Sequence, residues 1–394
     1  MKGRFAGCWT VAWPMSHRSA LSSAMPSSRE RWAAGTAAVA AAIPLAAAGL
    51  RLMPVAPHAT GPRVPAAYVL TGQGLEPIGS ATKVSGNPHS ASVSDQFAIT
   101  PDGRTAYVVT YKRVTPFSLP DRTRGRWIRA GSPSDIGITP DGKTAYVVST
   151  HADTVTPIAT ATNTPGKPIK VGSRPRIIAI TPDGKTAYVV NQDSGTVTPI
   201  ATATNIPGQP IKVGQTPLGI AITPDSKTAY VLNWASATVT PIVTATNTPG
   251  KPIKVGMVPV AIAITPDGKT AYVVSNAQDT VTPIATATNT AGTPIPVGHL
   301  PDAIAITPDG KTAYAVSQGT VYGTVTPIGT VTNTPGKPIK VGKLPVAIAI
   351  TANGKTAYVV NNKSGTVTPI AIATNTPGKP IQTGHSPYTI AIVP

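Results

Sequence analysis

Side chains that could carry out catalysis are scarce in this sequence of 394 residues. It holds 15 acidic residues, 6 histidines and 1 cysteine. The motifs Gly-x-Ser-x-Gly, His-Glu-x-x-His and Cys-x-x-Cys and the phosphate-binding P-loop are absent, and Glu76 is the only glutamate after residue 30. The sequence therefore predicts no catalytic residue, no metal site and no cofactor.

Polar and aromatic residues gather in loops that differ from one copy of an internal repeat to the next. His89, His299 and His385 each precede an expected first strand, and Asp135 lies in a similar loop. Loops of this kind would open on one face of the molecule and could bind a ligand, although surface loops also tolerate such residues without any function. The predicted ligand-binding residues are Arg174, Arg176, Trp234, His299, Asp302, His385 and Tyr388.

A net charge of +18 suits an anionic partner. The densest basic run is DRTRGRWIRAG at 121–131, where four arginines surround Trp127. We interpret Arg122, Arg124, Arg126 and Arg129 as a polyanion patch, with an ordinary solvated loop as the alternative. Sequence-specific nucleic-acid recognition is not expected, because aromatic residues make up only 5% of the chain.

The elements that must position these residues belong to a repeat. The unit TPDGKTAY begins at residues 139, 181, 265 and 307, with near-copies at 100, 223 and 351. A period of 39 to 44 residues separates the tyrosines of this unit, which is typical of a four-stranded propeller blade. In one unit we expect strands at 178–181, 185–191, 196–204 and 210–214, with TPDG as a type I turn between the first two. The tyrosines are Tyr68, Tyr107, Tyr146, Tyr188, Tyr230, Tyr272, Tyr314 and Tyr358.

The two ends of the repeat array complement each other. The array opens with a second strand, AAYVL at 66–70, and closes with a first strand in PYTIAIVP at 387–394. Pairing these ends would close a ring without free sheet edges. We therefore predict an all-β propeller of eight four-stranded blades over residues 63–394, with seven blades as the alternative.

Residues 1–62 differ in kind from the repeats. Arg29 and Arg31 precede an Ala-rich apolar run at 32–50, which is the order of a secretory signal, and Met25 would give a more ordinary leader length than Met1. An uncleaved membrane anchor is the alternative, but Pro44 interrupts the run. The expected location is secreted or at the cell surface, with membrane contact only through an uncleaved leader.

The repeat, of the form PxxIAITPDGKTAYVVN…GTVTPIATATNTPGKPIKVG, resembles the YVTN-family, or surface-layer-protein, β-propeller repeat. The tetrapeptides at 188–191 and 358–361 match the name of that family except at the third residue. The resemblance implies an exported propeller. We expect a non-enzymatic module that binds or scaffolds a cell-envelope polymer or protein partner. The alternative is a lactonase-like hydrolase or lyase, although calcium-dependent propeller lactonases use a Glu/Asn/Asp metal cluster that Glu76 alone does not supply.

Overall fold

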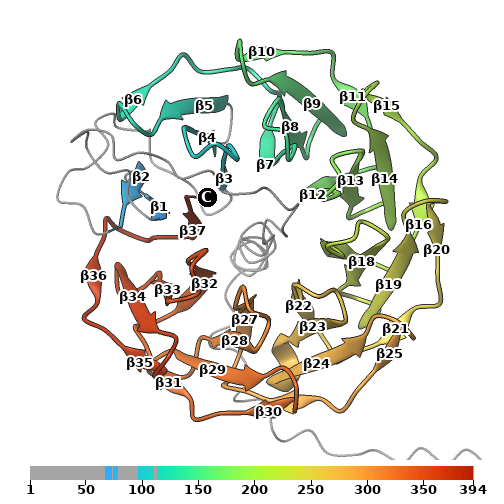
Figure 1. Ribbon diagram of the computed structural model, residues 1–394. Coiled ribbons are helices and arrows are strands. Elements are labelled where there is room, and N and C mark those ends of the chain that lie inside the picture. Colours follow the sequence, from blue (N-terminus) through green and yellow to red (C-terminus); the bar gives the residue numbers. More distant parts are fainter. Residues whose placement is uncertain (1–66, 73, 79–95, 111–112, 394) are drawn as a thin grey trace, which may run out of the picture.

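Eight β-sheets stand around a common axis in the computed structural model of the chain (Figure 1). The structure describes residues 67–72, 74–78, 96–110 and 113–393. The predicted eight-bladed propeller is confirmed, and the seven-bladed alternative is wrong. The predicted leader at 1–62 and His89 lie outside the described residues. No helix among the described residues is long and apolar enough to cross a membrane.

One blade shows how the repeat folds. Its strands are β12 (Pro175–Ile180), β13 (Thr186–Asn191), β14 (Thr196–Ala201), β15 (Ile206–Pro207) and β16 (Ile211–Lys212), all antiparallel. Hydrophobic and β-branched residues suit these half-buried strands, and the hairpin between the first two closes when Gly184 N–H donates to Thr181 O at 2.8 Å. Its Gly184 has a φ of 72°, as a glycine at the end of this turn allows.

The expected limits of the third and fourth strands were wrong. The third strand ends at Ala201 rather than 204, and the fourth is divided into β15 and β16. Between the pairs Ile200↔Pro207 and Val197↔Ile211, three residues of the outer strand face two of β14. Pro207 and Pro210 cannot donate ladder hydrogen bonds, so the outer strand carries a bulge there.

The other blades repeat this plan from the axis outward. The remaining first strands are β3 (Gln96–Ile99), β7 (Pro133–Ile138), β17 (Pro217–Ile222), β22 (Pro259–Ile264), β27 (Pro301–Ile306), β32 (Pro345–Ile350) and β37 (Thr389–Ile392). The remaining second strands are β1 (Ala67–Thr71), β4 (Thr105–Thr110), β8 (Thr144–Ser149), β18 (Thr228–Asn233), β23 (Thr270–Ser275), β28 (Thr312–Ser317) and β33 (Thr356–Asn361). The remaining third strands are β2 (Gly74–Pro77), β5 (Arg113–Ser118), β9 (Thr154–Ala159), β19 (Thr238–Val243), β24 (Thr280–Ala285), β29 (Thr324–Gly329) and β34 (Thr366–Ala371). The remaining outer strands are β6 (Thr123–Arg124), β10 (Thr164–Pro165), β11 (Ile169–Lys170), β20 (Thr248–Pro249), β21 (Ile253–Lys254), β25 (Thr290–Ala291), β26 (Ile295–Pro296), β30 (Thr334–Pro335), β31 (Ile339–Lys340), β35 (Thr376–Pro377) and β36 (Ile381–Gln382). A short 3-10 helix, η1 (Asn276–Gln278), follows β23.

The hydrophobic core lies between neighbouring blades. Each first strand contacts the first strand of the next blade, so these strands surround the axis. In one seam, Tyr146 and Val148 of β8 pack with Ile178 of β12 and Val189 of β13. Burying such side chains contributes about 1.5–3 kcal/mol each, which makes the seams the main source of stability.

A tyrosine also joins each blade to the next by a hydrogen bond. The hydroxyl of the buried AYV tyrosine donates to an asparagine Oδ1 of the following blade at 2.6–2.7 Å in six seams. These asparagines hold φ values of 52–58°, a left-handed conformation that asparagine tolerates better than most residues. The pairs are Tyr107–Asn163, Tyr146–Asn205, Tyr188–Asn247, Tyr230–Asn289, Tyr272–Asn333 and Tyr314–Asn375.

Strand β37 closes the ring, as the sequence predicted. It pairs with β1 in the register Ala67↔Ile392 to Leu70↔Thr389, and β2 pairs with the other edge of β1 (Figure 1). Glu76 supports the same blade, because its carboxylate accepts hydrogen bonds from Thr71 Oγ1 at 3.1 Å and Gly384 N–H at 2.9 Å. This buried glutamate therefore ties the two ends of the chain together.

Candidate functional site

The loops of the propeller divide between two faces with different chemistry. The repeated face consists of the turns between first and second strands and between third and fourth strands. The varied face consists of the loops from second to third strands and from each fourth strand to the next blade. The varied face changes its residues from blade to blade far more than the repeated face does, so it is the candidate functional site.

A β-bulge opens the first strand of six blades on the varied face. Each of these strands starts with proline, and the register shifts at the next residue. A bulge redirects a side chain at a fixed place in a sheet. The bulged residues are Ser134, Arg176, Leu218, Val260, Asp302 and Val346.

This geometry corrects the sequence interpretation of three residues. Arg176 and Asp302 belong to strands β12 and β27, and Asp135 belongs to β7, whereas all three were expected in loops. Proline is tolerated as the first residue of a strand, so the strand begins at Pro175 rather than at Ile178. The strand frame holds these side chains more rigidly than a loop would.

Asp135 and Arg176 occupy the seam between two neighbouring blades. Asp135 is 8% exposed, and its Oδ2 accepts the N–H of Ile178 in the next blade at 2.9 Å. Burial raises the pKa of Asp135 to about 7, against the opposing effects of the Ile178 and Ile136 N–H groups and of Arg176. Burial, followed by the charge of Arg174, lowers the pKa of the half-buried Arg176 guanidinium.

Arg174 lies in the loop just before these residues. Its side chain forms an exposed ion pair with Asp193 at 3.7 Å. Its backbone N–H donates to Asp153 Oδ1 at 2.8 Å, with Arg174 at a φ of 52°. The structure therefore places Arg174 and Arg176 together, beside three carboxylates.

A second polar group surrounds β27. Asn276 Nδ2 donates to Asp302 Oδ1 at 3.1 Å, and Gln318 Nε2 donates to Asp302 Oδ2. In the adjoining loop, His299 Nδ1 lies 2.9 Å from Asp279 Oδ2, and Asp279 Oδ1 accepts the Leu300 N–H at 2.8 Å. His299 and Asp302 thus share one part of the varied face.

The remaining predicted residues lie apart from these two groups. His385 O accepts the Gly72 N–H at 2.8 Å, and the Tyr388 N–H donates to Leu70 O at 2.9 Å, so both residues belong to the closing blade. Trp234 follows β18, and its backbone N–H donates to Thr216 O at 3.1 Å. The seven predicted ligand-binding residues therefore occupy four different blades.

Sequence reasoning did not select several residues of the varied face. Asp153 and Asp279 stand immediately before a third strand, at a left-handed position with φ of 53° and 56°. Four other blades have glycine or alanine at this place in the sequence, so the aspartate itself was the available signal. Asn276 and Gln318 were also missed, because nothing in the sequence pairs them with Asp302.

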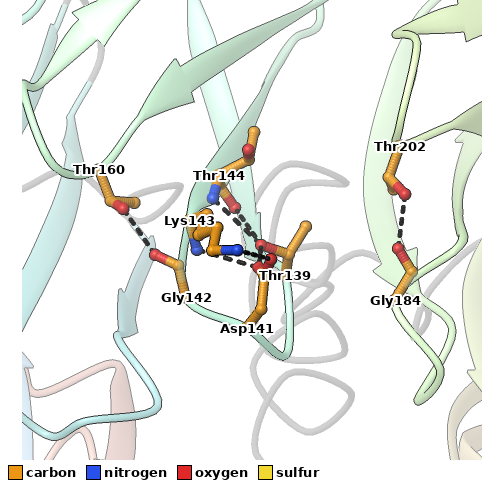
Figure 2. A network of polar contacts seen from close by, with 8 residues as sticks. All are labelled: Thr139, Asp141, Gly142, Lys143, Thr144, Thr160, Gly184 and Thr202. Atoms are coloured by element: carbon orange, nitrogen blue, oxygen red, sulfur yellow. Dashed lines mark hydrogen bonds and ion pairs between the residues drawn. The ribbon is translucent and has the colours of Figure 1, made fainter.

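The repeated face satisfies its polar groups within each turn (Figure 2). Thr139 Oγ1 donates to Asp141 Oδ1 at 2.6 Å, Asp141 accepts the Lys143 N–H at 3.0 Å, and Thr160 Oγ1 donates to Gly142 O at 2.6 Å. The same hydroxyl bond recurs from Thr202 to Gly184 in the next blade (Figure 2). These contacts give TPDGK a structural role.

The predicted polyanion patch is not a single surface. Arg124, Arg126 and Arg129 are exposed on the outer edge of the β3–β6 blade, and Arg113 stands over the exposed Trp127 ring at 5.9 Å. Arg122 occupies the left-handed position (φ 55°) that asparagine takes in the other seams. Burial raises the pKa of Tyr68 in the preceding blade, and the positive charge of Arg122 opposes that rise. The patch therefore comprises three of the four predicted arginines.

The described residues contain no group of three or more His, Cys, Asp or Glu side chains that could hold a metal ion. The nearest approach to catalytic geometry among them is the His299–Asp279 pair. Its exposed imidazole is oriented by a carboxylate, an arrangement that can serve general-base chemistry when a nucleophile is adjacent.

Comparisons with known proteins support the fold. A family described as "Lactonase, 7-bladed beta-propeller" matches residues 97–205, which is less than half of the chain. A comparison with curated protein sequences gave no match. The chain is therefore a β-propeller repeat protein, part of which is similar to that family.

Three solved structures illustrate the similarity. Kuenenia stuttgartiensis hydrazine synthase is 24% identical with a TM-score of 0.56, over 70% of this chain and 95% of that one. Dihydro-heme d1 dehydrogenase NirN in complex with DHE is 15% identical with a TM-score of 0.71, over 86% and 78%. A functionally unknown protein from Desulfotomaculum acetoxidans is 21% identical with a TM-score of 0.58, over 73% and 98%. At these identities the likeness concerns the fold alone.

Proposed function

We propose that the chain is an extracytoplasmic binding propeller of the YVTN surface-layer type, which recognises a cell-envelope polymer or protein partner through its varied face. The repeat, the leader-like residues 1–62 and the net charge of +12 over residues 66–394 (26 Lys and Arg against 14 Asp and Glu) support this proposal. In this view the identical turns build a rigid ring, and the varied loops make one side of it asymmetric.

One observation carries the proposal: the varied-face carboxylates of the described residues already hold the loops and seams in place. Asp153 and Asp279 bind backbone N–H groups, and Asp135 binds the next blade. Asp193 forms an ion pair with an arginine, and Asp302 accepts hydrogen bonds from two side-chain amides. A general base needs a free lone pair directed at substrate, whereas these groups stabilise a preorganised surface suited to recognition.

Retention of the protein on a cell-wall fraction tests this function. Alanine at Arg174, Arg176, Trp234 and His385 should abolish retention, because these side chains distinguish the varied face. The matched control carries alanine at Lys143, Lys185, Lys269 and Lys311 on the repeated face and should be retained. Loss in the control and retention of the varied-face variant would refute the proposal.

A lactonase-like hydrolase is the second candidate, supported by the family match over residues 97–205 and by the His299–Asp279 pair. Purified protein should then hydrolyse simple lactones, with rates followed in the presence of Ca²⁺ and of a chelator. His299→Ala should reduce such turnover by roughly 10²–10⁴-fold if the imidazole is a general base. Unchanged turnover in this variant would reject the assigned role of His299.

A further inference from the structure

The outer strands of the blades carry a row of basic residues at equivalent positions. The segment PGKPIK at 165–170 begins with the last residue of β10 and finishes with β11, in which Ile169 is buried and Lys170 is exposed. Its lysines recur at the same register, since Lys170, Lys212 and Lys254 face Thr154, Thr196 and Thr238 of the third strands. The segment at 124–129 fits the same pattern, because Gly125 N–H donates to Pro116 O at 2.8 Å as Gly166 N–H donates to Pro157 O at 2.7 Å. Arg126 and Arg129 therefore correspond to Lys167 and Lys170.

These residues form what we call the rim arc over four consecutive blades. Outer strands of neighbouring blades adjoin, because β11 contacts β15, β16 contacts β20 and β21 contacts β25. They follow the circumference of the ring (Figure 1). The arc ends at β25 and β26, where Thr293 and Pro296 replace the lysines. Its members, all exposed, are Arg126, Arg129, Lys167, Lys170, Lys212, Lys251 and Lys254.

The rim arc lacks the local compensation that the lysines of the TPDGK turns have. On the repeated face, the ammonium groups of Lys143, Lys185 and Lys269 lie 3.5–3.7 Å from the aspartates of their own turns. By contrast, the sequence has no acidic residue at 154–182, 194–224 or 226–266. The arc lysines form no ion pair with the described residues. Positive potential therefore accumulates along the rim rather than on the repeated face.

We propose that the rim arc binds a flexible, linear anionic polysaccharide that follows the circumference of the propeller. This surface is distinct from the varied-face site. A bilayer is flat and would meet a convex rim over only part of its arc. Duplex DNA has a persistence length of about 50 nm and resists such curvature.

Single-stranded nucleic acid fits this surface less well than a polysaccharide does. Such strands bind by stacking successive bases on several aromatic side chains. Trp127 is the only exposed aromatic residue of the arc within the described chain. One indole with Arg113 beside it, in the first blade of the arc, offers a single stacking place for a sugar ring.

Fluorescence anisotropy with labelled heparin as the probe tests the proposal on the full chain. The variant Lys170→Gln/Lys212→Gln/Lys254→Gln should weaken binding on the order of tenfold, and the dependence of log K on log salt should become shallower by about two to three. Glutamine is compatible with the strand, because Gln209 and Gln382 already occupy equivalent rim positions. Melting temperature checks that each variant is folded.

Three comparisons make the result decisive. The variant Lys185→Gln/Lys227→Gln/Lys269→Gln removes the same charge from the repeated face and should keep its affinity within about twofold, since those lysines are paired. Thr293→Lys/Pro296→Lys extends the arc by one blade and should strengthen heparin binding. Equal loss in the two triple variants, or self-association of the rim variant without loss of heparin binding, would overturn the proposal. Tighter binding to poly(dT) or to anionic vesicles than to heparin would replace the polysaccharide with that partner.

Discussion

Replacing Asp135 by asparagine should make the stability of the propeller less dependent on pH. Asp135 is buried in β7, and its pKa is raised from 3.8 to about 7 by burial. Because the folded protein binds this proton more tightly than the unfolded chain, the stabilising contribution is complete below about pH 4. It is lost as the pH rises towards and through 7.

The magnitude follows from the size of the shift. A rise of about three pKa units, at 1.36 kcal/mol each, corresponds to about 4 kcal/mol between pH 4 and pH 8. Asparagine does not titrate, and its Oδ1 can still accept the Ile178 N–H. The free energy of unfolding of Asp135→Asn, relative to that of the unchanged protein, should therefore increase by about 4 kcal/mol over this range.

Urea denaturation at about pH 4, 6 and 8 measures this difference. Asp141→Asn is the matched control. Hydrogen bonding from Thr139 lowers the pKa of Asp141, so its contribution is present above the unfolded pKa and is lost only as the pH falls through the folded value. Its difference from the unchanged protein should be constant from about pH 5 to 8. A constant difference for Asp135→Asn over the same range would refute the reasoning.

Three further changes test the frame. Deleting residues 387–394 removes β37, so it should expose the edge of β1 and lower the melting temperature markedly; an unchanged melting temperature would contradict the closure. Ser226→Gly relieves a residue at φ 63° but loses the hydrogen bond from Asp183 N–H to Ser226 Oγ at 3.0 Å, so calorimetry should find between no change and about 0.5 kcal/mol of stabilisation, and a clear loss would show that the hydrogen bond dominates. Tyr188→Phe should cost about 0.5–1.5 kcal/mol in urea denaturation by leaving Asn247 Oδ1 without its donor, whereas Tyr68→Phe should be neutral, since the buried Tyr68 hydroxyl has no partner among the described residues; equal effects would contradict this account.

Much of the frame was determined by the sequence itself. The period near 42 residues, the TPDG turns and the complementary ends at 66–70 and 387–394 were enough to predict the ring and its closure. These features are local, because a turn depends on proline and glycine at adjacent positions and a strand on alternating burial. The positive φ of Ser226 followed from the same reasoning, since glycine stands there in the other copies.

The tertiary structure decided how the charged side chains are used. PxxIAI contains no local signal that its second residue is a bulge, so Arg176 and Asp302 were expected in loops. The seam that buries Asp135 joins residues 43 positions apart, and Glu76 reaches Gly384 across 308 positions. The ion pairs of the TPDGK turns, by contrast, are local, because each lysine lies within 4 Å of the aspartate two residues before it. Burial and charge pairing depend on which blades meet in space, and closing the ring brings together residues that are distant along the chain.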